Sequence, residues 1–545
     1  MRTLIGEFAG NTSAHGWGKA SQTTSKLAKA AWIFTSSACS IVALFLIIKV
    51  VIKYCEFNTK DSIRVSKDEA VFPSVTVCPL TPISRKGMAT FRKELAENNS
   101  AIDSMLYYNN FLYVLGQYNL NISSLQNASE ELQLLYNQSY KRLHTNAGYY
   151  ENYQQSERLR YTIKQKDFIP SCKYQSEVCS EELYHSGHHE HFNCFTFNGP
   201  LSNISSLDVD SGPSAGLSLI LYLDIDLEHS SFYDPDYPTS GSQGVRVVIH
   251  EQGTWPDPEN DGFDIKAGNS VNVALSSERR ELMGQPWGDC ADHNDIKYDR
   301  WKYSTKACLL TCIQRLGFKR CGCIRGSLPV DDKTKDVEFC ANIQSREWLK
   351  SDPNVTLLRQ DLNQLNCSLQ EYSLSDILAQ EGCECKENCK IDKYDIMLSD
   401  SEWPMKGIEF HFYCDMIMKL GNYNENSSIY QAFHDRVASN CSSLAYDVER
   451  KKIINKDIGK DLREQFLRLN VYFKDSDTKV TTQTEDFSIG SMVSEIGGSL
   501  GLLIGMSVIS ISEVFILCLG ILAILIRKSK AQTKVETFKD KMEYP

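Results

Sequence analysis

The stretch GGSLGLLIGMSVISISEVF, residues 497–515, is apolar enough to lie in lipid, yet it contains four glycines, several serines and one glutamate. Gly497, Gly501 and Gly505 are four residues apart, so they share one helical face and allow neighbouring helices to approach closely. Glu513 favours a different use, because an ionisable side chain inside a membrane span is costly unless it faces water or a partner. A pore is therefore the stronger interpretation, and close helix packing is the alternative.

Two apolar stretches interrupt an otherwise polar chain of 545 residues, and each is long enough to cross about 30 Å of hydrocarbon. They are residues 28–54 and 487–526. The first begins too far from the N-terminus and lacks a small-residue cleavage site. It is therefore interpreted as a membrane anchor and not as a signal peptide. Basic residues lie around the start of the first stretch and just after the second: Lys19, Lys26, Lys29, Arg527, Lys528, Lys530 and Lys534.

This charge pattern places residues 1–27 and 527–545 in the cytoplasm and residues 55–486 outside, as in a multi-pass plasma-membrane protein embedded in the lipid bilayer. The outside region has nine glycosylation sequons, which fit that location: Asn98, Asn121, Asn127, Asn137, Asn203, Asn354, Asn366, Asn426 and Asn440. The net charge is −11 and no basic cluster suggests nucleic-acid binding.

Cys39 and Cys518 fall inside the two apolar stretches and Cys55 lies at the outer end of the first, which leaves 16 of the 19 cysteines in the outside region, ten of them between residues 290 and 389. An even number in an oxidising compartment predicts up to eight disulfides. Zinc at these clusters is the alternative, but thiols there would oxidise before they bound metal. No metal site and no cofactor are assigned.

After residue 155, strand-like runs dominate this region, among them CFTFNG, LSLILYLDI, GVRVVIHEQ and LNVYFKDS. Residues 84–155 instead show apolar residues at roughly helical spacing. We expect a mixed sheet with an inserted helical region and a disulfide-rich arm. No nucleophile motif or phosphate-binding glycine loop indicates an enzyme.

The sequence GMS at 505–507 resembles the Gly-x-Ser selectivity motif of the degenerin/epithelial sodium channel (DEG/ENaC) superfamily. Further segments match in the family's order: His15-Gly16, Trp32 at the start of the first span, FPSVTVC (72–78), NCFTFNG (193–199), GVRVVIHEQ (244–252), ACLLTC with CGC (307–323) and CECKENC (383–389). The match therefore extends almost from end to end.

This resemblance implies an α+β membrane protein, a homotrimer whose subunits each have two transmembrane helices and a disulfide-rich ectodomain of palm, finger, thumb, knuckle and ball. The finger would be about 79–171 and the thumb about 290–389. The disulfides implied are Cys78–Cys194, Cys172–Cys179, Cys290–Cys389, Cys308–Cys385, Cys312–Cys383, Cys321–Cys367 and Cys323–Cys340. Pairing the two remaining cysteines, Cys414 with Cys441, is our own inference.

The resemblance also implies a sodium-selective, amiloride-blocked pore with its selectivity filter at Gly505, Met506 and Ser507. Ser494 would lie at the gate, and His15 and Gly16 would re-enter from the cytoplasm to line the lower pore. Rings of Glu495 and Glu513 would attract cations; on an unbroken helix their 18-residue separation spans about 27 Å.

Gating is the least constrained property. Residues 54–72 lack the histidine of proton-gated relatives, which counts against acid sensing. ERLRY at 157–161 lacks an Arg-x-x-Arg cleavage site, which counts against an epithelial type. Both types are kept as alternatives. Overall similarity favours the invertebrate channels opened by FMRFamide, a short amidated neuropeptide. Finger tyrosines would bind such a ligand by stacking and cation–π contacts, with ordinary packing as the alternative: Tyr107, Tyr108, Tyr113 and Tyr118.

Two further interpretations stay open. HSGHHEH at 185–191 is interpreted as a solvated loop, with a zinc- or proton-modulated site as the alternative. ATP-gated receptors also have two spans and cysteine-rich exteriors, but they do not account for the Gly-x-Ser motif or the FPSVTVC strand.

Overall fold

The computed structural model describes two compact units. The residues that it describes are 16–67, 70–87, 161–179, 183–200, 210–225, 242–291, 297–298, 300–331, 334–340, 355–368, 383–417, 459–460 and 462–540. The first unit comprises the two ends of the chain and residues 283–288, and the second comprises most of the region between them.

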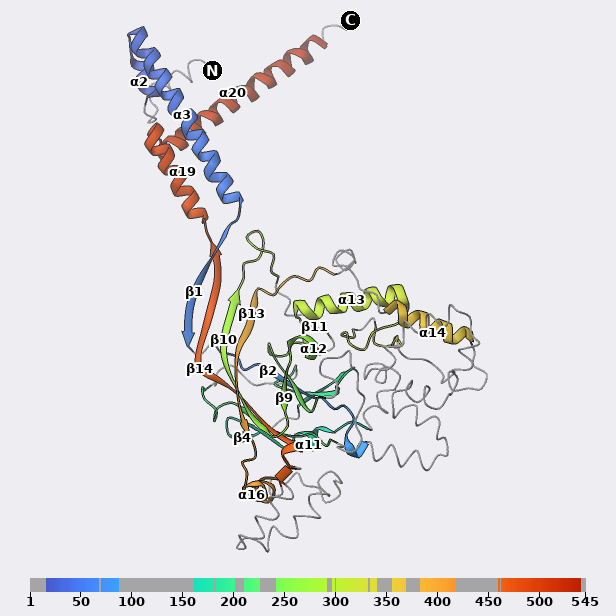
Figure 1. Cartoon of the computed structure of the whole chain (residues 1–545). Helices are drawn as coiled ribbons and strands as arrows, with labels where there is room; N and C mark the ends of the chain where they lie inside the picture. The colour runs from blue at the N-terminus through green and yellow to red at the C-terminus, as the bar shows by residue number, and fades with distance from the viewer. Residues whose placement is uncertain are drawn as a thin grey trace. The chain divides into compact units, whose positions relative to one another are not determined.

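In the described part of the first unit the helices are α2 (Trp17–Gln22), α3 (Lys26–Cys55), α19 (Ile489–Ile504) and α20 (Val508–Asp540). Helix α3 packs against both α2 and α19, and Figure 1 shows α19 lying beside α3. Among the described residues α3 is long and apolar enough to cross a membrane, and the pair α19–α20 would make a second span if its two parts act together. The expected first span, 28–54, thus lies within α3.

Beside a small two-stranded sheet, two larger β-sheets make up most of the described part of the second unit. One has seven strands in the order β13-β10-β14-β7-β3-β4, with β1 also paired to β14, and the other has the order β5-β6-β2-β8-β9. The strands of the larger sheet are β1 (Thr59–Lys67), β3 (Ser171–Tyr174), β4 (Glu177–Val178), β7 (Leu217–Tyr222), β10 (Asn269–Glu281), β13 (Lys390–Glu402) and β14 (Phe466–Glu485). Those of the smaller sheet are β2 (Ser74–Pro79), β5 (Tyr184–His188), β6 (Phe192–Phe197), β8 (Gly244–His250) and β9 (Phe263–Lys266).

Alternating apolar residues explain why these runs form strands. Val75 and Val77 of β2 and Val271 and Val273 of β10 are buried, and they belong to one core that draws on both sheets. In the larger sheet β10 runs antiparallel to β13 and parallel to β14, and Figure 1 shows it between these two strands. The expected strands LSLILYLDI and GVRVVIHEQ correspond to β7 and β8.

Short elements complete this unit. They are α11 (Gln165–Phe168), α12 (Pro258–Asp261), β11 (Lys297–Tyr298), β12 (Trp301–Lys302), α13 (Thr305–Cys321), α14 (Val355–Ser368), α16 (Glu409–His411) and a π-helical turn, Phe412–Ile417. Ser304 caps α13 by accepting a hydrogen bond from the backbone N–H of Ala307, and the left-handed Gly322 ends the helix. Helix α13 thereby holds three of the clustered cysteines, Cys308, Cys312 and Cys321, in one rigid element.

Candidate functional site: the break in the second membrane segment

Helix α19 ends where the quoted stretch has its fourth glycine. Gly505 has φ +67° and ψ +24°, a left-handed conformation that only glycine adopts without strain. Its N–H donates to the carbonyl of Gly501 at 3.0 Å, and the N–H of Met506 reaches back to the carbonyl of Leu500 at 3.3 Å. The segment thus ends in a glycine cap in the middle of its apolar stretch.

A new helix, α20, begins three residues later with a reciprocal cap. The Ser507 hydroxyl accepts from the N–H of Ser510 at 3.4 Å, and the Ser510 hydroxyl accepts from the N–H of Ser507 at 3.1 Å. This is the geometry of a capping box, with serine in place of the usual glutamate. Ser510 is fully buried, so its hydroxyl needs this partner.

The two caps change the hydrogen bonding of the last turn of α19. In an unbroken helix the N–H groups of Met506 and Ser507 would donate to the carbonyls of Leu502 and Leu503. Here those N–H groups donate elsewhere, to Leu500 and to the Ser510 hydroxyl. The carbonyls of Leu502 and Leu503 therefore lose their helical donors at the break, and such oxygens can coordinate a cation.

The break turns the chain by 83° between α19 and α20. The expected separation of Glu495 and Glu513, about 27 Å, assumed a straight helix between them. The bend shows that no such straight helix exists, so this separation is corrected. Ser494 and Glu495 are exposed on α19, and Glu513 is half-buried on α20. A methyl group added at Gly497 or Gly498 would meet nothing within 4 Å among the described residues, so neither glycine serves packing inside one chain.

Gly16 lies against the first membrane helix. It is buried with φ +89°, and a side chain there would collide with Ser36 of α3, whose Oγ would be 2.2 Å from the new Cβ. Its carbonyl accepts from the N–H of Ala20 at 2.9 Å and so begins α2. The absence of a side chain at Gly16 thus lets the segment before the membrane pack on α3.

Sequence reasoning missed a contact at the end of α3. The ring of Trp287 meets that of Phe57 edge-on, with centroids 5.7 Å apart, and Phe57 meets Tyr54 at 5.6 Å. Lys53, also on α3, has its Nζ 4.2 Å from the ring centroid of Phe487, which lies just before α19. In the sequence, the only hint that Trp287 has a structural role is that it lies three residues before the disulfide-bonded Cys290. The ring contacts pack residues 283–288 against the C-terminal end of α3.

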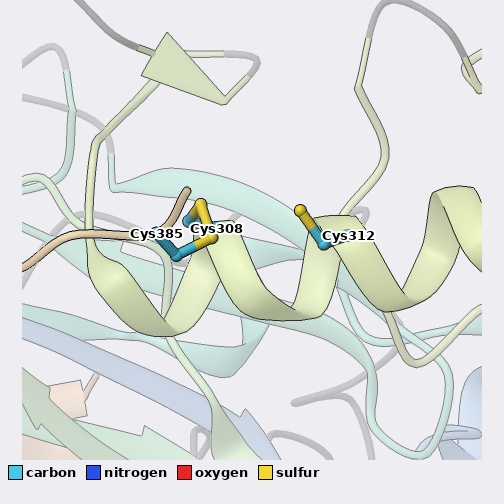
Figure 2. Close-up of side chains that lie close together, drawn as sticks. All are labelled: Cys308, Cys312 and Cys385. Atoms are coloured by element: carbon cyan, nitrogen blue, oxygen red, sulfur yellow. A yellow bond between two sulfur atoms is a disulfide. The ribbon is translucent and has the colours of Figure 1, made fainter. Parts of the chain in front are cut away.

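Seven disulfides join described cysteines of the second unit, and they join the same pairs that the family resemblance implies. They are Cys78–Cys194, Cys172–Cys179, Cys290–Cys389, Cys308–Cys385, Cys312–Cys383, Cys321–Cys367 and Cys323–Cys340. Figure 2 shows Cys308 bonded to Cys385, with Cys312 one turn further along α13. Their three sulfurs lie close enough for a metal ion, but disulfide bonds leave no thiolate to bind one.

Comparison with known proteins decides the family. Residues 8–517, nearly the whole chain, match the family described as amiloride-sensitive sodium channel. The chain belongs to this family. Its members are sodium-conducting, amiloride-blocked channels of the plasma membrane, so this protein is a channel subunit with a disulfide-rich ectodomain and not an enzyme.

Several curated channels are similar to this one. The FMRFamide-activated amiloride-sensitive sodium channel of Cornu aspersum is 26% identical over 97% of this chain and 84% of its own length. The degenerin unc-8 of Caenorhabditis elegans is 24% identical over 65% of this chain. The epithelial sodium channel subunit alpha of Mus musculus is 25% identical over 66% of it. The chain spans only 39% and 43% of the lengths of these last two relatives.

The histidine cluster of this channel subunit is not the solvated loop that its polarity indicated. His188 ends β5, and His188, His189 and His191 are all buried under neighbouring elements. The rings of His188 and His191 stack with centroids 5.0 Å apart, and those of His188 and His189 lie 4.7 Å apart. Burial lowers the pKa of His188 well below 6.5, with the neighbouring imidazoles adding to it, and lowers the pKa of His191 to about 4. Both imidazoles are therefore neutral at physiological pH.

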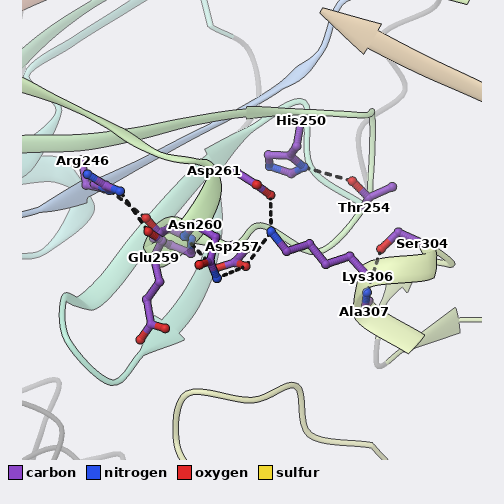
Figure 3. Close-up of polar contacts among 11 residues, drawn as sticks. Arg246, His250, Thr254, Asp257, Glu259, Asn260, Asp261, Ser304, Lys306 and Ala307 are labelled. Atoms are coloured by element: carbon purple, nitrogen blue, oxygen red, sulfur yellow. Dashed lines mark hydrogen bonds and ion pairs between the residues drawn. The ribbon is translucent and has the colours of Figure 1, made fainter. Parts of the chain in front are cut away.

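Helix α12 connects this cluster to the start of α13. Glu259 of α12 contacts His189, with its Oε1 2.5 Å from Nε2. Lys306 of α13 makes ion pairs of 2.7 Å with both Asp257 and Asp261, as Figure 3 shows. Arg246 of β8 donates to the carbonyls of Pro258 and Glu259. Helix α12 thus carries contacts to the turn after β5, to β8 and to α13.

Some expected site residues lie outside the described part of the channel. They are His15, the tyrosines 107, 108, 113 and 118, Cys441, and all sequon asparagines except Asn366. Asn366 is half-buried on α14, next to the disulfide-bonded Cys367. Cys414 is disulfide-bonded, but its pairing with Cys441 stays a prediction.

Proposed function

We propose that this chain forms a homotrimeric, sodium-selective channel of the plasma membrane that an extracellular FMRFamide-type neuropeptide opens. Both termini would be cytoplasmic, with the second unit outside and sodium as the permeant ion. The observation that carries the pore assignment is the capped break at residues 505–507, in the middle of an apolar segment.

In this proposal three copies of residues 505–507 surround the ion path. Carbonyls released from helical bonding at the break, together with the Ser507 hydroxyl, replace part of the hydration shell of sodium. The glycine cap and the capping box fix these oxygens before the ion arrives, so little reorganisation is needed when it binds. A rigid constriction of this kind favours the ion that fits it.

Other expected residues support conduction and closure around this filter. Glu495 and Glu513 place negative charge on either side of the break, which attracts cations and repels anions. Ser494, exposed on α19, provides the small side chain needed where the helices close, and His15-Gly16 lines the cytoplasmic end of the pore.

Exposed apolar side chains on α19 support assembly from several copies. Leu502 and Val493 of α19 are 87% and 62% exposed, and Gly497 and Gly498 have no neighbour within 4 Å of an added methyl group among the described residues. A small-residue face beside apolar side chains is typical of helices that pack against a second copy in a membrane.

Peptide gating rests on the extent of similarity. The match to the peptide-activated snail channel runs over 97% of this chain, whereas the matches to unc-8 and the mouse epithelial subunit cover about two thirds. The finger would bind the peptide through Tyr107, Tyr108, Tyr113 and Tyr118, which offer aromatic faces for Phe and Arg side chains.

Acid sensing or constitutive opening is the second candidate, and one observation favours the former. Burial raises the pKa of Glu251 to about 7 and that of Asp224 to about 6, so two carboxyls of the second unit gain protons in mild acid. An acid-sensing channel needs such groups.

Two-electrode recording of this subunit expressed alone separates the candidates. We expect micromolar amidated peptide to evoke an amiloride-blocked sodium current and a step to about pH 5 to evoke none. Replacing Tyr107 and Tyr108 by alanine should raise the half-activating concentration about tenfold for each 1.4 kcal/mol of lost contact, because stacking faces are removed. Selectivity and single-channel conductance should stay at wild-type values. A current evoked by acid and not by peptide would overturn the assignment.

A further inference from the structure

Two histidines and a glutamate outside the pore lie together with the spacing of metal ligands. His188, His189 and Glu259 each offer one ligand atom, and these atoms lie within 4.8 Å of one another. The imidazole centres of His188 and His189 are 4.7 Å apart. Two imidazoles that share a tetrahedral ion at about 2.0–2.1 Å have their centres roughly 5 Å apart, so little movement is needed to bring both onto one ion.

We propose that His188, His189 and Glu259 bind a zinc ion that clamps α12 to strand β5. Two imidazole nitrogens and one carboxylate oxygen suit zinc, whereas calcium and magnesium prefer oxygen ligands alone. The ion takes the place of the proton between His189 Nε2 and Glu259 Oε1, and the ligating imidazole stays neutral with its one proton on Nδ1, which lies 3.5 Å from Glu190 Oε1. Water completes the coordination on the side where Glu259 is exposed.

The neighbouring His191 gives independent support. Its Nδ1 lies 3.1 Å from the carbonyl of Pro79, which can only accept, so Nδ1 carries the proton and Nε2 carries a lone pair. That Nε2 atom is buried and has no hydrogen-bond partner among the residues that the structure describes. A buried lone pair without a donor is costly, and the ring stacks directly on His188. A cation at His188 offsets this cost.

The proposed zinc site lies next to the ion pairs that join α12 to α13. Glu259 lies in the four-residue helix α12, whose other carboxylates hold Lys306 at the start of α13. In Figure 3 the Glu259 carboxylate extends away from Lys306, so it is available to the histidines while Asp257 and Asp261 hold the thumb helix. A bound ion therefore fixes α12 on two sides and restrains α13 against β5.

Calorimetric titration of the metal-stripped full-length channel in detergent tests the proposal. We expect one zinc ion per chain at this site, unaffected by millimolar calcium. His189→Ala should abolish this binding, and Glu259→Gln should weaken it tenfold or more. His185→Ala is the matched control: this histidine lies on the same strand, but its Nε2 pairs with Asn193 at 2.9 Å, so its loss should leave zinc affinity unchanged.

The Glu259→Gln variant keeps the test decisive even if a buried histidine is needed for folding, because this side chain is exposed. Zinc should also slow hydrogen exchange at the amides of residues 258–262 in the wild type and not in this variant. Wild-type affinity in Glu259→Gln, or equal loss in His185→Ala and His189→Ala, would overturn the proposal.

Discussion

Glu251, just after β8, shows how one buried carboxyl makes stability depend on pH. Burial raises its pKa from 4.5 to about 7, and the carboxylate of Asp392 adds to this effect, while Lys302 and Arg279 oppose it. The folded protein therefore holds a proton that the unfolded chain releases above about pH 4.5. The resulting stabilisation is fully present below about pH 4.5 and is lost as pH rises through about 7.

We expect Glu251→Gln, which imitates the protonated carboxyl, to stabilise the channel at pH 8 by up to about 3 kcal/mol. The advantage should shrink as pH falls and vanish near pH 4.5, where the wild-type side chain is neutral in both states. Thermal unfolding of the two proteins in detergent across this range measures the difference. A difference that stays constant from pH 8 to pH 5 would show that Glu251 does not titrate in this window.

Gly16 is the residue whose lack of a side chain matters most clearly before the membrane. Alanine there should lose the contact between α2 and α3, because its Cβ would meet Ser36 Oγ at 2.2 Å and its φ of +89° is strained. We expect Gly16→Ala to reduce current at normal surface expression. Adding Ser36→Gly should restore part of the current, since it removes the collision but not the backbone strain. Equal currents in the single and double variants would contradict the steric explanation.

Among the elements, α20 depends on its capping box for a defined beginning. Ser510→Ala removes the acceptor for the N–H of Ser507, and losing such a cap costs about 0.5–2 kcal/mol. We expect a looser filter and a lower sodium-to-potassium permeability ratio. Ser512→Ala is the control, because this hydroxyl bonds only the carbonyl of Ile509 behind it. The cap would be irrelevant to selectivity if both variants kept the wild-type ratio.

Local patterns made several elements predictable. Alternating apolar residues marked β2, β7 and β8, and continuous hydropathy marked α3. Hydropathy could not give the bend of 83°, because it records composition and not the left-handed dihedral angles of Gly505. For the same reason the sequence did not reveal that Ser510 caps the start of α20.

Contacts between distant segments were the part that sequence could not supply. The histidines at 188–191 were assigned to solvent on polarity, yet Pro79 from β2 and Glu259 from α12 lie against them. The ring contact between Phe57 and Trp287 joins segments 230 residues apart. The disulfides were predictable only through family resemblance, because spacing alone permits many pairings.

At the scale of the whole molecule, the two units divide the work in our proposal. The first unit holds the break at 505–507, and the second holds the seven disulfides between described cysteines and, in the proposal, the residues that bind the peptide. The proposed trimer would also cover two side chains that one chain leaves largely exposed, Leu502 and Phe34. Selectivity and ligand response should therefore respond to separate sets of substitutions.

The reversal potential of the amiloride-blocked current tests the central claim, that the break at residues 505–507 is the selectivity filter. It should be recorded from wild type and from Gly505→Ala as external sodium is replaced by potassium. Alanine disfavours the left-handed cap by about 1–2 kcal/mol, so the helix should tend to continue and the released carbonyls to regain helical donors. We predict a large shift in the wild type, as expected for a sodium-selective pore, and a reduced shift or no current in the variant at unchanged surface expression. An identical permeability ratio in both proteins would contradict the account.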